Sequence, residues 1–170
     1  MNTNLKELQN SIYKSCDFEV KDFCVETEST EYDACQFTLN SKQIISRSSK
    51  ITPKKVGQFV TFWKRANANA NANANANAPI APFDTKDNFD FFVVNIRKDN
   101  RFGQFVFPKA VLIKKGIIST TTKEGKRAFR VYPSWDIPTS KQAERSQKWQ
   151  LYYFYDAKTV DLEKVKSLYM

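Results

Sequence analysis

Histidine is absent from this sequence, and its absence excludes several kinds of chemistry at once. A serine-type triad, a histidine general base and most zinc sites all need an imidazole. Any chemistry in this chain would therefore rest on carboxylates, lysine, arginine, tyrosine or a thiol. Cysteine is also scarce, because Cys16, Cys24 and Cys35 form an odd and loosely spaced set. That pattern argues for reduced thiols and against a disulfide framework.

Long hydrophobic runs are missing too. No apolar stretch approaches the roughly 20 residues that a membrane-spanning helix needs. The N-terminus lacks the basic-then-apolar layout of a signal peptide. We therefore expect a cytoplasmic protein that is not a membrane protein. The 170 residues, of which 41% are hydrophobic and 14% aromatic, predict one globular domain over residues 1–170.

Acidic residues are few relative to basic ones. The chain has 27 Lys and Arg against 18 Asp and Glu, which gives a formal net charge of +9. A basic surplus of this size favours a polyanionic partner such as DNA, RNA or a nucleotide, and failing that an anionic membrane surface.

A helix is predicted over residues 52–65, where a capping threonine and a proline precede apolar residues at helical spacing. Lys54 and Lys55 would lie in its first turn, where unpaired amides already make the helix end electropositive. With Arg47 and Lys50 just upstream, this arrangement predicts a phosphate site at the helix N-terminus. The alternative is a solvated basic helix end, neutralised by carboxylates from elsewhere in the fold.

Other helices and strands are predicted from periodicity and turn residues. In residues 66–78 alanine and asparagine alternate strictly, and both are poor strand formers, so we expect a low-complexity surface loop there. The other predicted helices cover residues 2–15, 108–116, 139–152 and 159–169. The predicted strands cover residues 34–39, 43–47, 91–96, 104–107 and 128–132, and the first four form two hairpins.

Two further predicted helices also begin with a cation. Lys109 follows Pro108, and Lys141 lies inside a capping box formed by Thr139 and Gln142. Counting the helix over residues 52–65, three helix starts carry lysine. Scattered surface charge would give fewer, so the pattern supports phosphate binding at Lys109, Lys141 and Gln142.

The helix over residues 139–152 has an unusual face, on which Ala143, Gln147 and Gln150 mix amides with apolar contacts. The two glutamines are either satisfied inside the fold or point into a site.

Arg130, Tyr132 and Trp135 lie together at and just beyond the end of the predicted strand over residues 128–132. Aromatic rings beside an arginine can stack on nucleic-acid bases. We therefore count these three residues as candidates for nucleic-acid contact, and expect most other aromatic side chains in the core.

A series of motifs carries a family resemblance. They are Lys50-Ile51-Thr52-Pro53-Lys54-Lys55-Val56-Gly57-Gln58-Phe59-Val60, Gly103-Gln104-Phe105-Val106-Phe107-Pro108-Lys109, Gly125-Lys126-Arg127, Arg130-Val131-Tyr132-Pro133, Trp135-Asp136, Lys141-Gln142-Ala143, Gln147 and Trp149-Gln150. With them the chain resembles the MepB family over about residues 26–154. The Ala-Asn tract departs from the family pattern, which has a short loop there.

The resemblance implies a bacterial cytoplasmic protein with an α/β fold. This would be a single domain whose mixed central β-sheet is flanked by helices, similar to restriction-endonuclease-like and tRNA-endonuclease-like proteins. The resemblance brings no established reaction.

Metal-dependent nucleases of the implied fold hold Mg²⁺ with a helical glutamate, a strand aspartate and a Glu-x-Lys pair. If the chain is an enzyme, Asp90 would be the aspartate, Glu31 or Glu28 the helical acid, and Lys109 the lysine. Asp90 and Glu31 would then hold the Mg²⁺. The Glu-x-Lys pair is missing, because the adjoining strand offers Gln104 instead. The sequence therefore favours binding without catalysis.

Two classes of function follow. The first is a cytoplasmic nucleic-acid-binding protein of nuclease-like fold, which binds phosphates through a basic helix N-terminus and is therefore salt-sensitive and weakly sequence-specific. The alternative is a Mg²⁺-dependent nuclease or a nucleotide-processing phosphoesterase. A protein-interaction accessory that meets an acidic partner is a third, weaker expectation.

Overall fold

The protein is built on a six-stranded mixed β-sheet. The structure, a computed structural model, describes residues 1–66 and 78–170, so nearly all of the predicted Ala-Asn loop at residues 66–78 lies outside the described residues. The strand order is β1-β2-β3-β8-β9-β11, in which β3 and β8 are parallel and the other neighbours antiparallel. The strands are β1 (Val20–Val25), β2 (Cys35–Leu39), β3 (Lys42–Ser48), β8 (Phe91–Lys98), β9 (Arg101–Pro108) and β11 (Phe154–Asp156).

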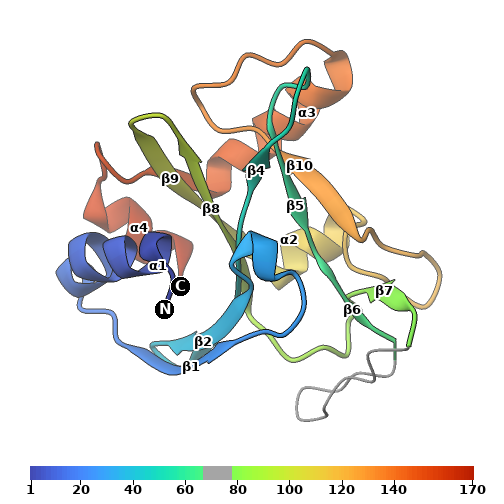
Figure 1. The fold of residues 1–170 in the computed structure, drawn as a ribbon, viewed down its shortest axis with the longest axis horizontal. Coiled ribbons are helices and arrows are strands. Elements are labelled where there is room, and N and C mark those ends of the chain that lie inside the picture. The colour runs from blue at the N-terminus through green and yellow to red at the C-terminus, as the bar shows by residue number, and fades with distance from the viewer. Residues whose placement is uncertain (67–77) are drawn as a thin grey trace.

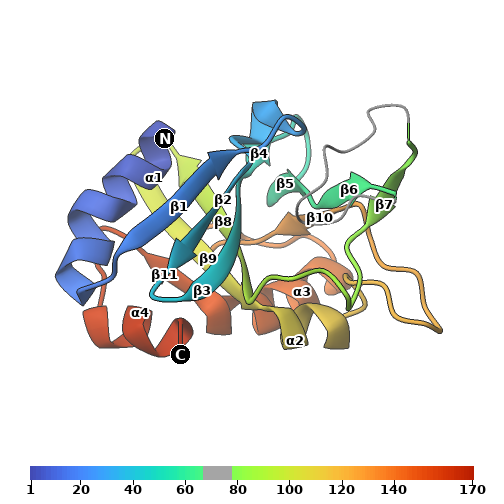
Figure 2. The same cartoon turned by 90° about the horizontal axis from the view of Figure 1, so that it is seen from below.

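Helices lie on both faces of this sheet (Figures 1 and 2). Helices α1 (Thr3–Leu8) and α4 (Leu162–Leu168) lie side by side on one face, and α2 (Lys109–Lys114) and α3 (Lys141–Gln150) lie on the other. The arrangement confirms the predicted α/β fold class with a mixed central sheet flanked by helices. Within residues 1–66 and 78–170, no helix is long and apolar enough to cross a membrane.

Strand β8 separates two hydrophobic cores. Phe91 and Val93 pack toward α1 and α4, whereas Phe92 and Val94 pack toward the second core on the opposite face. All four residues are buried. A strand covered on both faces is apolar almost throughout, which is why the sequence of β8 predicted a strand correctly.

The first core contains a buried polar network centred on Gln104. Its Oε1 accepts hydrogen bonds from the hydroxyls of Tyr155 and Tyr169, both at 2.7 Å, and its Nε2 donates to Tyr13 at 3.0 Å and to Asn95 at 2.8 Å. Burial raises the pKa of Tyr13 to about 12 and holds those of Tyr155 and Tyr169 well above 10. The tyrosines therefore stay neutral donors in the core.

Both predicted hairpins of the main sheet are confirmed. Strands β2 and β3 pair through a two-residue loop in which Asn40 and Ser41 both have positive φ, at 47° and 68°. Positive φ at both positions is the geometry of the type I′ turn that suits the twist of a hairpin. Strands β8 and β9 also pair across a two-residue loop, residues 99–100, in which Asp99 has positive φ, at 52°.

The N-terminal helix is confirmed, and the Asn2 side chain caps it by accepting from the Leu5 amide at 2.9 Å. It continues as a π-helical turn over Gln9–Tyr13 and a 3₁₀ turn over Lys14–Cys16. Helix α2 also begins after Pro108 as predicted.

Two other helix starts differ from the prediction. Ser140, not Thr139, caps α3, because its hydroxyl accepts from the amide of Ala143 at 3.1 Å. Helix α4 begins later than residue 159, since Asp161 caps it through the amide of Glu163. In both cases the capping side chain nearest the helix takes the role.

The predicted helix over residues 52–65 is wrong. The segment follows strand β4 (Lys50–Ile51) and contains a turn and two strands, β5 (Gln58–Thr61) and β6 (Trp63–Arg65). Strand β5 joins β4 and β10 (Ala128–Val131) in a three-stranded sheet of order β10-β5-β4, and β6 pairs with β7 (Ile80–Pro82).

Two features explain why this segment is extended. The run Phe59-Val60-Thr61-Phe62-Trp63 consists of β-branched and aromatic residues that favour strands, and Val60 and Phe62 alternate into the second core. Lys54 and Gly57 adopt positive φ, at 65° and 79°, which ends any helix.

Candidate functional site

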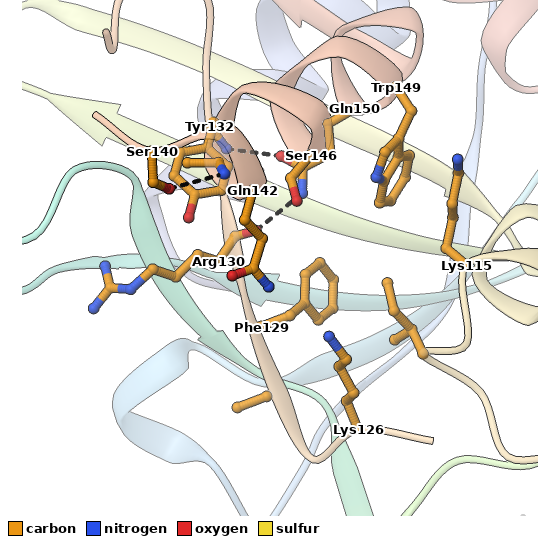
Figure 3. Close-up of a pocket in the computed structure, with 13 residues that line it drawn as sticks. Lys115, Lys126, Phe129, Arg130, Tyr132, Ser140, Gln142, Ser146, Trp149 and Gln150 are labelled. Carbon is orange, nitrogen blue, oxygen red and sulfur yellow. Dashed lines mark hydrogen bonds between the residues drawn. The ribbon is translucent and has the colours of Figure 1, made fainter. Parts of the chain in front are cut away.

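A pocket of about 340 Å³ lies between strand β10, helix α3 and the residues that follow α2 (Figure 3). Lys115 comes from the end of α2, Lys126 from the segment before β10, and Arg130 from β10 itself. Phe129 and Trp149 contribute half-buried aromatic rings. No acidic side chain is among the described residues that line it.

The lysines of this pocket have no acidic partner among the residues that the structure describes. Lys126 extends toward Phe129, and the Lys115 ammonium lies 5.3 Å from the centre of the Trp149 ring (Figure 3). Neither lysine forms an ion pair with any residue that the structure describes. A third ammonium, that of Lys123, lies close to Gly116, the residue after Lys115. A Cβ atom added to Gly116 would be 2.8 Å from it. Uncompensated cations around a pocket attract an anion.

Arg130 connects the pocket to the outer face of the three-stranded sheet β10-β5-β4, which we call the small sheet. Its guanidinium turns away from Phe129 (Figure 3) and donates to Thr52 Oγ1 at 2.6 Å. The register pairs both Lys50 and Arg130 with Phe59, so the three side chains share one face. The structure thus brings Lys50 and Arg130 together, although not at a helix end.

Helix α3 presents three different stripes because its residues recur at spacings of four and three. Gln142, Ser146 and Trp149 line the pocket. Lys141, Arg145 and Lys148 are exposed and form a basic row on the solvent side. The third stripe is Ala143, Gln147 and Gln150, which faces the protein.

The two glutamines of that third stripe are satisfied inside the fold. Gln147 Nε2 donates to the carbonyls of Pro133 at 2.9 Å and Asp136 at 2.8 Å. Gln150 bridges the edge of β10: its Nε2 donates to Arg130 O at 2.9 Å, and its Oε1 accepts from the Tyr132 amide at 2.8 Å. Of the two alternatives left by the sequence, the structural role is therefore the correct one.

Of the predicted binding residues, Arg130, Tyr132 and Gln142 line the pocket, and Lys141 begins the helix beside it. Lys55 and Trp135 line a different depression of about 330 Å³. Lys54 lies in the exposed turn after β4. The predicted group is thus spread over several places in the fold.

Arg47 is committed to the interior. Its side chain is 1% exposed and its Nη2 lies 2.7 Å from Glu26 Oε2, while Nη1 donates to Ser46 O. A buried cation that already has a carboxylate partner is not available to a phosphate. The phosphate role predicted for Arg47 therefore has no geometric support.

Lys109 is also occupied. Its ammonium donates to the carbonyls of Thr85, at 3.0 Å, and Asp87. It fixes the loop between β7 and β8 to the start of α2. The loop carries its own ion pairs, because Lys64 Nζ lies 3.0 Å from Asp84 and 2.9 Å from Asp87.

The two carboxylates predicted to hold a metal lie apart. Asp90 Oδ2 accepts from the Gln43 amide, at the beginning of β3. Glu31 lies in the exposed 3₁₀ turn Thr30–Tyr32, whose Tyr32 ring contacts Lys50, beyond the end of β3. Gln43 and Lys50 are seven residues apart in the sequence, which corresponds to about 23 Å of extended chain. Among the residues that the structure describes, no three acidic or cysteine side chains form a metal-binding group.

Sequence analysis missed Lys115, Lys126, Ser146 and Trp149 as pocket residues. The spacing of Gln142, Ser146 and Trp149 was a usable signal, since it marks a polar-aromatic stripe between the buried and the charged faces of α3. The lysines gave no local signal, because they meet only through the tertiary fold.

The MepB-like family profile matches residues 26–156. A crystal structure of MepB is similar to this chain, with 31% sequence identity and a TM-score of 0.76, over 94% of this chain and 100% of the other. The structure of a bacterial homing endonuclease matches with 15% identity and a TM-score of 0.45, over 96% of this chain and 90% of the other. No curated protein matches the chain significantly.

Proposed function

This chain belongs to the MepB-like family, and from that premise we propose that it is a cytoplasmic protein that binds nucleic acid through phosphate groups. The pocket between β10 and α3 is the proposed contact site. The observation that carries the proposal is the pair Lys115 and Lys126, which flank a pocket without acidic lining residues in the described chain. A phosphate is the anion that such a pair suits best in a chain of net charge +9.

The surroundings of the pocket extend the basic surface in two directions. The row Lys141, Arg145 and Lys148 continues it along α3. On the other side, Arg130 leads to Lys50 across the small sheet. A polynucleotide backbone needs several such contacts in line, whereas a single free phosphate needs only one.

Binding of this kind has a defined salt dependence. Each lysine that neutralises a phosphate contributes about 0.7 to the slope of log K against log salt for a single strand, and about 0.9 for duplex DNA. Lys115→Ala with Lys126→Ala should therefore weaken oligonucleotide binding and lower the slope by about 1.5. Fluorescence anisotropy over a salt series measures both quantities.

A matched control removes two lysines elsewhere. Lys6→Ala with Lys158→Ala makes the same change in net charge, but both lysines are exposed and lie outside the pocket lining. This control should leave the slope unchanged. Equal effects of the two double variants, or no oligonucleotide binding by the unmodified protein, would refute the pocket as the binding site.

The alternative function is a Mg²⁺-dependent nuclease or a nucleotide-processing phosphoesterase. The distance between Asp90 and Glu31 along β3 favours binding without catalysis. Incubation with DNA and RNA in Mg²⁺, Mn²⁺ or EDTA should give no metal-dependent cleavage. Cleavage that Asp90→Ala abolishes would select the enzyme instead.

A further inference from the structure

The edge of strand β10 leaves a short gap in its hydrogen bonding, and the gap opens into the pocket. The Phe62 amide donates to Arg127 O, so residues 127, 129 and 131 face β5. By alternation, the backbone groups of Ala128, Arg130 and Tyr132 face outward. Both Ala128 and Arg130 line the pocket.

Both ends of this outer edge are already covered. The Lys126 amide donates to Ile117 O at 2.9 Å, and Gln150 covers Arg130 O and the Tyr132 amide. Within β10 this leaves the Ala128 amide, the Ala128 carbonyl and the Arg130 amide on the outer edge. None of these three groups has a hydrogen-bond partner among the described residues. The gap is therefore bounded on both sides, and within β10 it contains three polar groups.

Gln150 shows which chemical group fits this edge. Its carboxamide places one donor and one acceptor side by side, and these bridge the carbonyl of residue 130 and the amide of residue 132. The Ala128 carbonyl and the Arg130 amide repeat this pair two residues earlier in the strand. A guest with an adjacent donor and acceptor in one plane would be bound in the same way.

We propose that Ala128 O and the Arg130 amide bind the Watson–Crick edge of an unpaired nucleobase, whose phosphate lies against Lys115 and Lys126. The Watson–Crick edge of every common base has such an adjacent donor and acceptor, and it is free only when the base is unpaired. The inference rests on the proposed function and narrows it to single-stranded or extruded nucleotides.

The rest of the pocket suits such a guest. Its volume of about 340 Å³ is at the lower end of small-ligand sites, which fits one nucleotide. Phe129 and Trp149 provide half-buried apolar surface beside the gap, as bases require. A peptide strand is a poorer fit, because it would need a longer run of open backbone than Ile117 and Gln150 leave.

The test is a titration of the ¹⁵N-labelled protein with nucleoside monophosphates, followed by the amide resonances of Ala128 and Arg130. We expect adenosine or uridine monophosphate to shift the Arg130 amide downfield, because it gains an acceptor. Ribose 5-phosphate, which keeps the phosphate and lacks the base, should leave that amide unmoved while still shifting resonances of Lys115 and Lys126.

Methylated bases supply the matched ligand control. N6,N6-dimethyladenosine and 3-methyluridine monophosphates lack the base donor without a change of charge, and should bind about tenfold more weakly. Filling the pocket by Ser146→Phe on the surface of α3 should produce the same loss for the unmodified nucleotides. An oligonucleotide should bind more tightly as a single strand than as a duplex.

The outcomes separate this inference from the proposed function. If duplex and single strand bind equally, and methylated and unmodified bases bind alike, the base site is refuted, although Lys115→Ala with Lys126→Ala would still weaken binding. If the double lysine variant changes nothing, the phosphate proposal itself fails. If neither nucleotide moves the Arg130 amide, the edge of β10 is not the base site.

Discussion

Replacing Glu26 by glutamine should damage the fold more than replacing any surface acid. Glu26 Oε2 lies 2.7 Å from Arg47 Nη2, and the two side chains are only 18% and 1% exposed. The Arg47 Nε is buried without a hydrogen-bond partner among the described residues. Glutamine keeps the shape of Glu26 but removes the charge, so the guanidinium would stay buried without a counterion.

The size of the effect can be worked from this burial. Removal of one partner from a buried ion pair costs about 3–5 kcal/mol. Glu26 retains some contact with solvent, so we expect the lower end, about 3 kcal/mol. For a chain of this length, each kcal/mol shifts Tm by about 2–4 °C. The variant should therefore melt about 6–12 °C below the unmodified protein.

Urea unfolding followed by tryptophan fluorescence gives the free energy directly. The control is Glu19→Gln, which removes the acid of the exposed pair with Lys21, whose side chains are 70% and 62% exposed. Such surface pairs contribute about 0–1 kcal/mol. Combining Glu26→Gln with Arg47→Met should recover much of the loss, because no buried charge remains. If Glu26→Gln costs no more than Glu19→Gln, Arg47 is not held as described.

Three further changes test other parts of the structure. Burial acts to raise the pKa of Asp84, but hydrogen bonds from Lys64 and the backbone outweigh burial and keep the pKa below the usual 3.8. Asp84→Asn should therefore be less stable than the unmodified protein above about pH 4. Urea midpoints should show this difference in stability shrinking as the pH falls through the depressed pKa. At the alkaline end, burial raises the pKa of Tyr13 to about 12. The contribution of neutral Tyr13 to the free energy of unfolding is therefore full below the unfolded pKa of about 10 and is lost toward pH 12. Tyr13→Phe should reduce the fall of the free energy of unfolding with pH, and an unchanged pH dependence would refute the raised pKa of Tyr13. Gln150→Leu leaves the Arg130 carbonyl and the Tyr132 amide without partners and should cost about 2–4 kcal/mol. Gln142→Leu, at an exposed position on the stripe that lines the pocket, should cost little. Equal losses in urea unfolding would show that Gln150 does not support the strand.

Much of the main sheet could be predicted from the sequence, because local signals agree there with the fold. Strand β8 is apolar throughout, and Asn40 and Ser41 supply the turn that a two-residue hairpin needs. Strands β1 and β11 were missed. Strand β1 carries exposed charges such as Lys21 and Asp22, and β11 is only three residues long, so neither has a clear alternating pattern.

Residues 52–65 show where local pattern is ambiguous. Val56, Phe59, Val60 and Trp63 match helical spacing, but Phe59 and Trp63 lie on the outer side of the extended chain. Whether the segment takes the helical or the strand period depends on its neighbours β4 and β10. Strand β4 lies across a turn from β5, and β10 is distant in the sequence. The basic charge was identified correctly, whereas its location required the tertiary contacts of α2, β10 and α3.

The amide of Gln104 makes the two ends of the described chain depend on each other during folding. Hydroxyls from Tyr13, in the N-terminal helical segment, and Tyr169, after α4, meet at this one side chain and lie 3.0 Å apart. If either terminal helix detaches from the sheet, Gln104 loses one tyrosine hydroxyl. A polar group of the remaining network is then left buried without its hydrogen-bond partner. Both helices should consequently detach together, so that hydrogen exchange at the two ends follows one opening event, not two independent fraying motions.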